Sequence, residues 1–206
     1  MGKQDPGFTG NETGAGNDHT SPFFPALAQT PGNEYLSAKS LMMDGYCQQC
    51  HADVHEKWQY SAHRFSSFNN PAYRFSVMKT RDAGMAKDGN THRSRFCAGC
   101  HDPVPLFSGA FDDPGFGDLD DPLASAGITC TSCHAITSIN SPRGNADFTL
   151  VEPQHYPFTF SSNPFLQWLN QQLVKAKPAF HKKTFLKPLH GQPEFCGTCH
   201  KVHLPP

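Results

Sequence analysis

The eight cysteines of the chain all lie in four copies of one pattern, Cys-x-x-Cys-His. The copies read CQQCH, CAGCH, CTSCH and CGTCH, and they begin at positions 47, 97, 130 and 196. Three chemistries use two cysteines at this spacing: a redox-active disulfide, half of a zinc site, and covalent attachment of haem. Only haem attachment explains the histidine, because the two thiols bond to the porphyrin's vinyl groups and the next residue ligates the iron.

The two competing chemistries fit the pattern poorly. A zinc site needs two pairs at short separation or outlying histidines, and neither predicts a histidine after every second cysteine. A thioredoxin-like site would occur once and would leave three pairs unexplained. The sequence therefore predicts four covalently attached haem c groups. The predicted attachment residues and proximal iron ligands are Cys47, Cys50 and His51; Cys97, Cys100 and His101; Cys130, Cys133 and His134; and Cys196, Cys199 and His200.

Eight of the twelve histidines lie outside the motifs and could supply second axial ligands. Each of the four irons can take a second nitrogen ligand, so these eight histidines are better candidates for axial ligands than histidines of an ordinary protein are. For the fourth haem, His181 and His190 compete, because both lie on the segment that leads into its motif. The alternative for either is a solvent-facing position among the lysines.

The second haem has no obvious partner close in sequence. His55 and His92 are candidates, and an open site is the alternative. His55 lies four residues after His51 on the same helical face, so it would have to reach a haem other than its own. His19 could reach a haem of this or a neighbouring chain. We expect His203 to ligate nothing within this chain.

The composition indicates how these motifs must be positioned. Apolar content is modest at 37%, glycine and proline are abundant, and the mean hydropathy is −0.54, so a conventional core would be thin. Four large apolar porphyrins would organise the remaining loops. We therefore expect a mainly α-helical protein with extensive loops, in a compact multihaem cytochrome c fold organised around four covalently bound haems. The expected domains are a flexible N-terminal arm over residues 1–32 and a tetrahaem cytochrome domain over residues 33–206.

The pattern of helix signals predicts where the helices lie. Asn33 could cap a short helix over residues 34–43, and a longer helix over residues 44–65 would carry the first motif. Residues 102–127 hold so much Pro, Gly and Asp that they indicate a surface loop, with an extended chain after the second motif. The clearest amphipathic helix covers residues 163–176, with Asn163 at the N-cap and Pro164 in the first turn.

Charge and export signals limit the function classes. The formal net charge is −1, which argues against nucleic acid as a partner. Lysines gather before the fourth motif, and both a solvated face and a docking surface explain them. Haem is attached to such motifs outside the cytoplasm, so we expect an exported protein, periplasmic or extracellular. The chain contains no signal peptide and no transmembrane segment, and its end soon after the fourth motif is compatible with a longer, truncated parent.

The run CQQCHADVHEKWQYSAHR resembles the opening of the cytochrome c-554 family, tetrahaem electron carriers associated with hydroxylamine oxidation, and GITCTSCH resembles that family's third site. The resemblance covers residues 44–203, but the N-terminal arm and the aspartate-rich loop have no counterpart. It implies that His63 ligates the third haem and that His155 ligates the first. It also implies that one haem, the second by motif order, lacks a distal histidine.

Three functions remain open. The leading one is an electron-transfer protein that passes single electrons along four closely packed haems to redox partners, such as other multihaem cytochromes or an oxidoreductase. The second is a haem oxidoreductase of the nitrite or hydroxylamine type, which needs one open iron and proton donors. The third is a subunit or domain of a larger multihaem conduit or filament, which would involve self-association.

Overall fold

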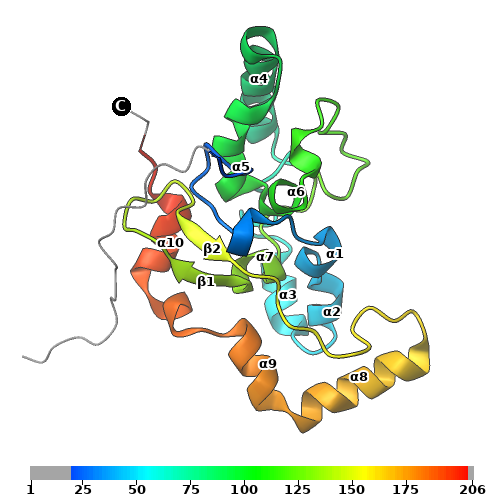
Figure 1. The fold of residues 1–206 in the computed structure, drawn as a ribbon. Coiled ribbons are helices and arrows are strands. Elements are labelled where there is room, and N and C mark those ends of the chain that lie inside the picture. Colours follow the sequence, from blue (N-terminus) through cyan, green and yellow to red (C-terminus); the bar gives the residue numbers. More distant parts are fainter. Residues whose placement is uncertain (1–19, 204–206) are drawn as a thin grey trace, which may run out of the picture.

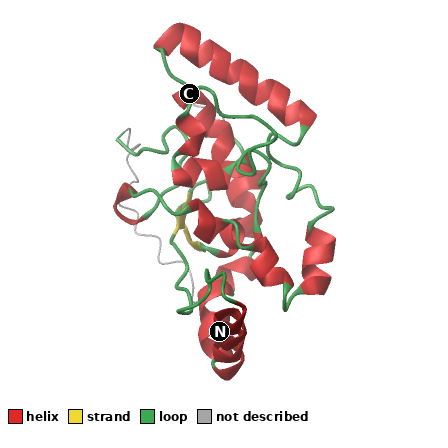
Figure 2. Ribbon diagram, turned by 90° about the vertical axis from the view of Figure 1, so that its right-hand side faces the viewer, coloured by secondary structure: helices red, strands yellow, loops and turns green. Residues whose placement is uncertain are grey.

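The computed structural model describes residues 20–203. This part of the chain is mainly helical, with one small sheet (Figures 1 and 2). In chain order its helices are α1 (Ala38–Leu41), α2 (Asp44–Gln48), α3 (Ala52–Trp58), α4 (Pro71–Asp88), α5 (Arg95–His101), α6 (Pro103–Ser108), α7 (Cys130–His134), α8 (Pro164–Ala176), α9 (Pro178–Phe185) and α10 (Pro193–His200). Short 3₁₀ turns lie at Pro31–Asn33, His92–Ser94, Ala110–Asp112 and Pro188–Gly191.

The sheet is an antiparallel hairpin of β1 (Ile136–Ile139) and β2 (Phe148–Leu150). The loop between its strands ties distant parts of the chain together. The Leu27 N–H donates to the Asn145 carbonyl at 3.2 Å, and the Ala146 N–H donates to the Thr198 carbonyl at 2.8 Å. The loop therefore joins the N-terminal segment to α10.

Phenylalanine rings from several segments form the core beside α5 and α6. The Phe23 and Phe107 ring centroids lie 4.9 Å apart, and Phe107 also contacts Phe148 of β2. Phe68 and Phe111 extend the cluster towards the chain after α6. All five side chains are at most 2% exposed. The second motif, on α5, is thus next to a conventional apolar core.

Part of the predicted N-terminal arm packs against this core. Residues 1–19 lie outside the described residues, but Phe23 and Ala28 are buried. Gln29 forms an isolated parallel bridge with Thr149. Residues 20–32 therefore belong to the folded body.

The prediction of an extended chain after the second motif is wrong. Residues 103–108 form α6, and Val104, Leu106 and Phe107 in it are buried. Pro103 and Pro105 both lie in the first turn, where backbone N–H groups have no intrahelical partner, so the missing N–H of proline costs nothing there. Proline in this segment begins a helix instead of preventing one.

The other helix predictions vary in accuracy. Asn163 caps α8 by accepting from the Phe165 and Leu166 N–H groups, which confirms the amphipathic helix. The single helix predicted over residues 44–65 is wrong: α2 and α3 are separate, because His51 has non-helical dihedral angles between them. The helix predicted over residues 34–43 shortens to α1, and Asn33 has a φ of 58°, which does not suit an N-cap.

Two helices mark opposite ends of the molecule. Both ribbon views place α4 at one end and α8 at the other, with the hairpin between them (Figures 1 and 2). Asn70 caps α4 and Gly89 ends it in the left-handed conformation. Over residues 20–203, none of the helices is both long enough and apolar enough to cross a membrane.

Candidate haem-binding site

Each of the last three motifs lies at the end of a short helix. The second motif ends α5, the third forms α7 and the fourth ends α10. Cysteines three residues apart lie on the same helical face, so each pair of thiols can approach one porphyrin edge. The first motif differs, because Cys47 lies in α2 whereas Cys50 and His51 lie beyond its end.

Two proximal histidines are fixed by backbone carbonyls. The Nδ1 of His101 lies 2.9 Å from the Ser66 carbonyl oxygen, and the Nδ1 of His134 lies 2.6 Å from that of Phe185. A carbonyl only accepts, so Nδ1 carries the proton and Nε2 keeps a free lone pair. Burial lowers the pKa of both imidazoles, which favours the neutral, ligating form.

Two proximal histidines each have a second histidine ring at the spacing of an axial pair. The ring centroids of His51 and His181 lie 6.1 Å apart and nearly parallel, at 12°, and those of His63 and His200 lie 6.0 Å apart. Metal–imidazole bonds are about 2 Å long, so two imidazoles on opposite sides of one metal have ring centres about 6 Å apart. The separation of the ring centroids in both pairs is therefore that of an axial pair.

A third pair is tighter. The ring centroids of His134 and His190 lie 4.8 Å apart, so an iron between these rings would require them to separate. The Nε2 of His190 is buried and has no hydrogen-bond partner. Burial lowers the pKa of His190 to about 4, so the ring is neutral near pH 7. The Nδ1 of His190 accepts a hydrogen bond from the Lys187 N–H at 3.1 Å, so the neutral ring carries its proton on Nε2, and ligation through Nε2 would require that proton to move.

The histidine assignments implied by the resemblance differ from these pairs. His63 lies against His200 of the fourth motif instead of His134 of the third. His155 packs on Phe160 at 4.7 Å, and its Nε2 is buried without a partner. His181, which competed with His190 for the fourth haem, lies instead against His51 of the first motif.

The remaining histidines lie elsewhere. His55 packs against Trp58, with ring centroids 5.3 Å apart, and its Nδ1 is buried without a partner. His92 is exposed at the start of a 3₁₀ turn. The backbone of His203 exchanges hydrogen bonds with Asn145, and His19 lies outside the described residues.

His63 is held in place by a close backbone approach. The Ile128 N–H donates to the His63 carbonyl at 2.9 Å. The preceding residue, Gly127, has a φ of +66°, and a Cβ there would lie 2.7 Å from that same carbonyl oxygen. Only glycine fits both the dihedral angle and the space.

The second motif has a tyrosine against its histidine. The Tyr73 ring stacks on His101 with centroids 4.3 Å apart and planes 18° apart. The Tyr73 hydroxyl donates to Asp102, which is fully buried, and burial raises the pKa of that carboxyl to about 7. No histidine ring within residues 20–203 has a ring contact with His101. Sequence reasoning missed Tyr73, because it lies 28 positions before His101 and only the three-dimensional packing brings the two rings together.

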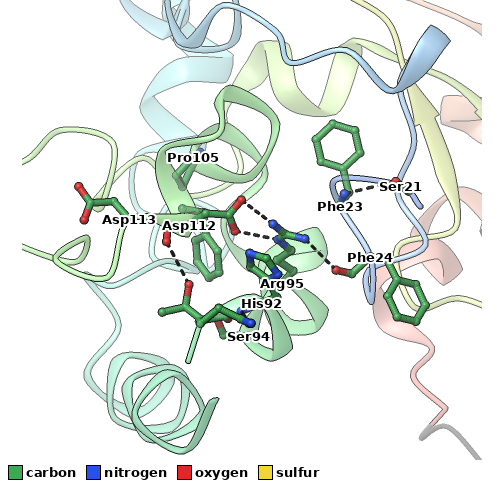
Figure 3. A network of polar contacts seen from close by, with 12 residues as sticks. Ser21, Phe23, Phe24, His92, Ser94, Arg95, Pro105, Asp112 and Asp113 are labelled. Carbon is green, nitrogen blue, oxygen red and sulfur yellow. Dashed lines mark hydrogen bonds and ion pairs between the residues drawn. The ribbon is translucent and has the colours of Figure 1, made fainter. Parts of the chain in front are cut away.

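A buried ion pair anchors the helix of the second motif (Figure 3). At the start of α5, the Arg95 guanidinium donates two hydrogen bonds of 2.7 Å to the Asp112 carboxylate. It donates a third, of 3.2 Å, to the Phe24 carbonyl. Thr91 donates to the backbone carbonyl of Asp112 at 3.2 Å. Arg95 thus connects α5 to the N-terminal segment and to the aspartate-rich loop.

The first and third motifs are neighbours. The Cys47 thiol lies close enough to Cys130 to raise the pKa of that thiol. His51 also lies close enough to His134 to lower the pKa of that imidazole. The two haem-attachment segments therefore lie side by side.

The second and fourth motifs are neighbours in the same way. The Cys100 thiol lies close enough to Cys199 to lower the pKa of that thiol, and His200 adds to the lowering by burial of the pKa of His101. The third motif adjoins the fourth, because Cys199 contributes to a raised pKa of about 11 at Cys133, where burial is the main cause. The spatial order is first, third, fourth, second.

The donor set fits haem. Among the described residues, no three His, Cys, Asp or Glu side chains gather where they could hold a metal ion. A zinc site needs such a group, whereas haem iron takes four nitrogens from the porphyrin and one or two ligands from the protein. Each pair of cysteines followed by a histidine fits this requirement.

Residues 46–135 match the family model described as cytochrome c554 and c-prime. The matched range contains the first three motifs and covers less than half of the chain. No curated protein and no solved structure matches the chain significantly. The match supports a c-type cytochrome that carries covalently bound haem c and resembles this family, and the family suggests an electron carrier.

Proposed function

We propose that the chain is a tetrahaem electron-transfer protein, with haems attached at all four Cys-x-x-Cys-His motifs. The attached haems supply one-electron redox chemistry. The chain's own residues hold the attachment sites close together and provide the axial histidines. Three of the four motifs lie in the range that matches the family model, and the fourth has the same pattern.

The observation that carries this proposal is the pairing of histidine rings. His181 stands opposite His51, and His63 stands opposite His200, both at the separation that an iron between two imidazoles requires. His190 beside His134 is the proposed third pair. Histidine on both sides of an iron blocks substrate binding and leaves electron transfer as the available function.

The contacts between motifs support a single route for electrons. Cysteine contacts join the first motif to the third and the second to the fourth, while Cys133 lies near Cys199. We propose that electrons pass in the order first, third, fourth, second, or in the reverse order. This order differs from the order along the sequence.

The second haem is where we propose ligand binding in addition to electron transfer. His101 has a tyrosine against its ring, and no described histidine makes a ring contact with it. We propose an open axial position there, which would bind small ligands such as carbon monoxide. Catalysis of nitrite or hydroxylamine chemistry would also require proton donors directed at that position.

The setting of the protein is proposed by analogy with other c-type cytochromes. Haem attachment to this motif occurs outside the cytoplasm, so we propose an exported protein, periplasmic or extracellular. Its partners would be redox proteins, either other multihaem cytochromes or an oxidoreductase. Residues 20–32 would join residues 33–206 in one tetrahaem domain.

A low-temperature electron paramagnetic resonance spectrum of the oxidised holoprotein tests the proposal. We expect three low-spin signals from the histidine pairs and one high-spin signal from the second haem. Four low-spin signals would remove the open position but keep the carrier. Fewer than four haems in total would contradict the tetrahaem assignment, and rapid turnover of nitrite or hydroxylamine would favour an enzyme.

A further inference from the structure

Positive charge is concentrated in one segment of the chain. Residues 153–193 contain no Asp or Glu, although the whole chain has eighteen acidic residues and a net charge of −1. The five lysines of this segment lie on α8, on α9 and close to them: Lys175, Lys177, Lys182, Lys183 and Lys187. The α8–α9 end of the molecule is therefore basic.

Most of these lysines are free to meet a partner. Lys187 is the exception, because its Nζ donates to the His134 and Thr184 carbonyls at 2.6 Å and 2.8 Å. Lys182 and Lys183 are exposed, whereas His181 turns towards His51. At 3.6 residues per turn, Lys183 lies on the side of α9 opposite His181. Its charge thus faces away from the first motif.

The outer face of α8 adds aromatic surface to this charge. Phe165 and Trp168 are 65% and 53% exposed and stack with ring centroids 5.9 Å apart. Lys175 follows Trp168 by seven residues, so it lies on the same face of the helix. We call Phe165, Trp168, Lys175, Lys182 and Lys183 the lysine face. Exposed aromatic side chains among cations are typical of binding surfaces.

Side chains of α8 contact the first motif. The Asn170 side chain, on the side of α8 away from Phe165 and Trp168, donates to the Tyr46 hydroxyl at 2.8 Å. The Gln171 side chain, which lies between Trp168 and Lys175 on the helix surface, donates to that of Gln49 at 2.8 Å. Tyr46 and Gln49 flank Cys47, and the neighbouring Cys50 and His51 are exposed. A partner on the lysine face would therefore lie beside the first motif, one end of the proposed route.

We propose that the lysine face docks an acidic redox protein, which exchanges single electrons with the chain at the first motif. This inference rests on the proposed function. Opposite charge favours an acidic partner and would steer its approach. A protein fits better than a membrane, because the exposed large apolar side chains of α8 and α9 are few and lie on two helices among exposed lysines, which is too little apolar surface for insertion. They are Phe165, Trp168, Phe180 and Leu186.

The test uses the holoprotein and a reduced acidic flavodoxin as the probe. In the measured step, the flavin hydroquinone loses one electron and one ferric haem becomes ferrous. At low ionic strength, Lys182→Glu with Lys183→Glu should slow this reaction about tenfold and weaken equilibrium binding similarly. The difference should shrink as salt is added, because screening shortens the reach of surface charge. Trp168→Ala should weaken binding by about tenfold at all salt concentrations.

Matched controls lie on α4, at the other end of the molecule. Lys79→Glu with Lys87→Glu makes the same charge change at two exposed lysines, and Phe75→Ala removes an aromatic ring that is 67% exposed. These variants should react and bind as the unchanged protein does. A free neutral flavin semiquinone, which needs no docking, should reduce every variant at one rate.

The outcomes separate the two proposals. If the lysine-face variants bind flavodoxin and react with it as the α4 variants do, the docking site is overturned. Reduction of all variants by free flavin at one rate would in that case still support the proposed electron-transfer function. Failure of both donors to reduce the unchanged protein would overturn the carrier as well. Sedimentation showing self-association through the lysine face, or its co-sedimentation with anionic phospholipid vesicles, would replace the proposed partner with a second copy or a membrane.

Discussion

His181 and His190 both precede the fourth motif in sequence, yet each lies against the proximal histidine of a different motif. Nine residues separate them, enough for α9 to end and for the chain to turn before the next helix. Sequence distance from a motif is therefore a poor guide to which motif histidine a second histidine lies against. The packing of helices decides that contact, and the proposed axial pairs rest on it.

Replacing His181 distinguishes the structure's pairing from the one that the resemblance implies. His181→Ala should leave one additional haem high-spin and able to bind carbon monoxide when reduced, because His51 would lose its opposing ligand. Covalent attachment should persist, since it depends on Cys47 and Cys50. His155→Ala is the matched control and should leave all spin states unchanged. The reverse result would restore His155 as the ligand of the first haem.

Tyr73 should stabilise the second motif through its hydrogen bond to Asp102. Tyr73→Phe keeps the ring on His101 but leaves a fully buried carboxyl without its donor. An unsatisfied buried group costs about 1–3 kcal/mol, so the guanidinium unfolding midpoint should fall. Tyr35→Phe is a suitable control, because that tyrosine is 49% exposed and should lose much less stability. Equal losses in both variants would contradict a special role for Tyr73.

The attachment residues stay a prediction from the sequence, made from the spacing that covalent attachment requires. Twelve positions follow directly from the repeated pattern. The distal histidines could not be predicted in this way, since a nitrogen can reach iron from any segment that the fold brings near. Tyr73 and Asp102 carry no motif, and their contact depends on how α4 crosses α5.

At the scale of elements, one glycine controls where a histidine lies. Gly127→Ala should push against the His63 carbonyl and strain the backbone at a positive φ, which costs about 1–3 kcal/mol. The spectrum of the fourth-motif haem should change as His63 moves away from His200. Gly45→Ala is the control, because nothing lies within 4 Å of a Cβ built there. An unchanged spectrum in Gly127→Ala would separate His63 from that haem.

The Arg95 network should contribute most of the anchoring of α5. Arg95→Ala leaves Asp112 partly buried without its cation, and breaking a buried pair in this way costs about 3 kcal/mol. Arg93 lies two residues away and pairs with Asp88 at the surface, so Arg93→Ala should have little measurable effect. Thermal unfolding of the two holoproteins, compared at one pH, checks this difference.

Helix α8 was predictable because both an N-cap residue and a proline mark its start. Helix α6 was not predictable, because its two prolines suggest a break in a helix unless their position in the first turn is known. The core position of Phe23 was also missed. Its surroundings in the sequence are rich in Gly, Asn and Pro, and its ring is buried against Tyr35 and Phe107 of α6.

At the scale of the whole molecule, the number of haems is the simplest quantity to measure. All eight cysteines belong to complete motifs, so the intact mass should exceed the chain mass by four haems, and no thiol should react with an alkylating reagent under denaturing conditions. Cys196→Ser with Cys199→Ser should remove one haem from that mass. A reactive thiol in the unchanged protein would show that at least one site is not used.

The bonds of the hairpin loop also set an order of events during biosynthesis. The N-terminal segment is made first, but its partner at Asn145 is made more than a hundred residues later, after three motifs have already emerged. The N–H of the next residue, Ala146, donates to the carbonyl of Thr198 in the fourth motif, which is made later still. The contact between the hairpin loop and α10 can therefore form only after the fourth motif has been made.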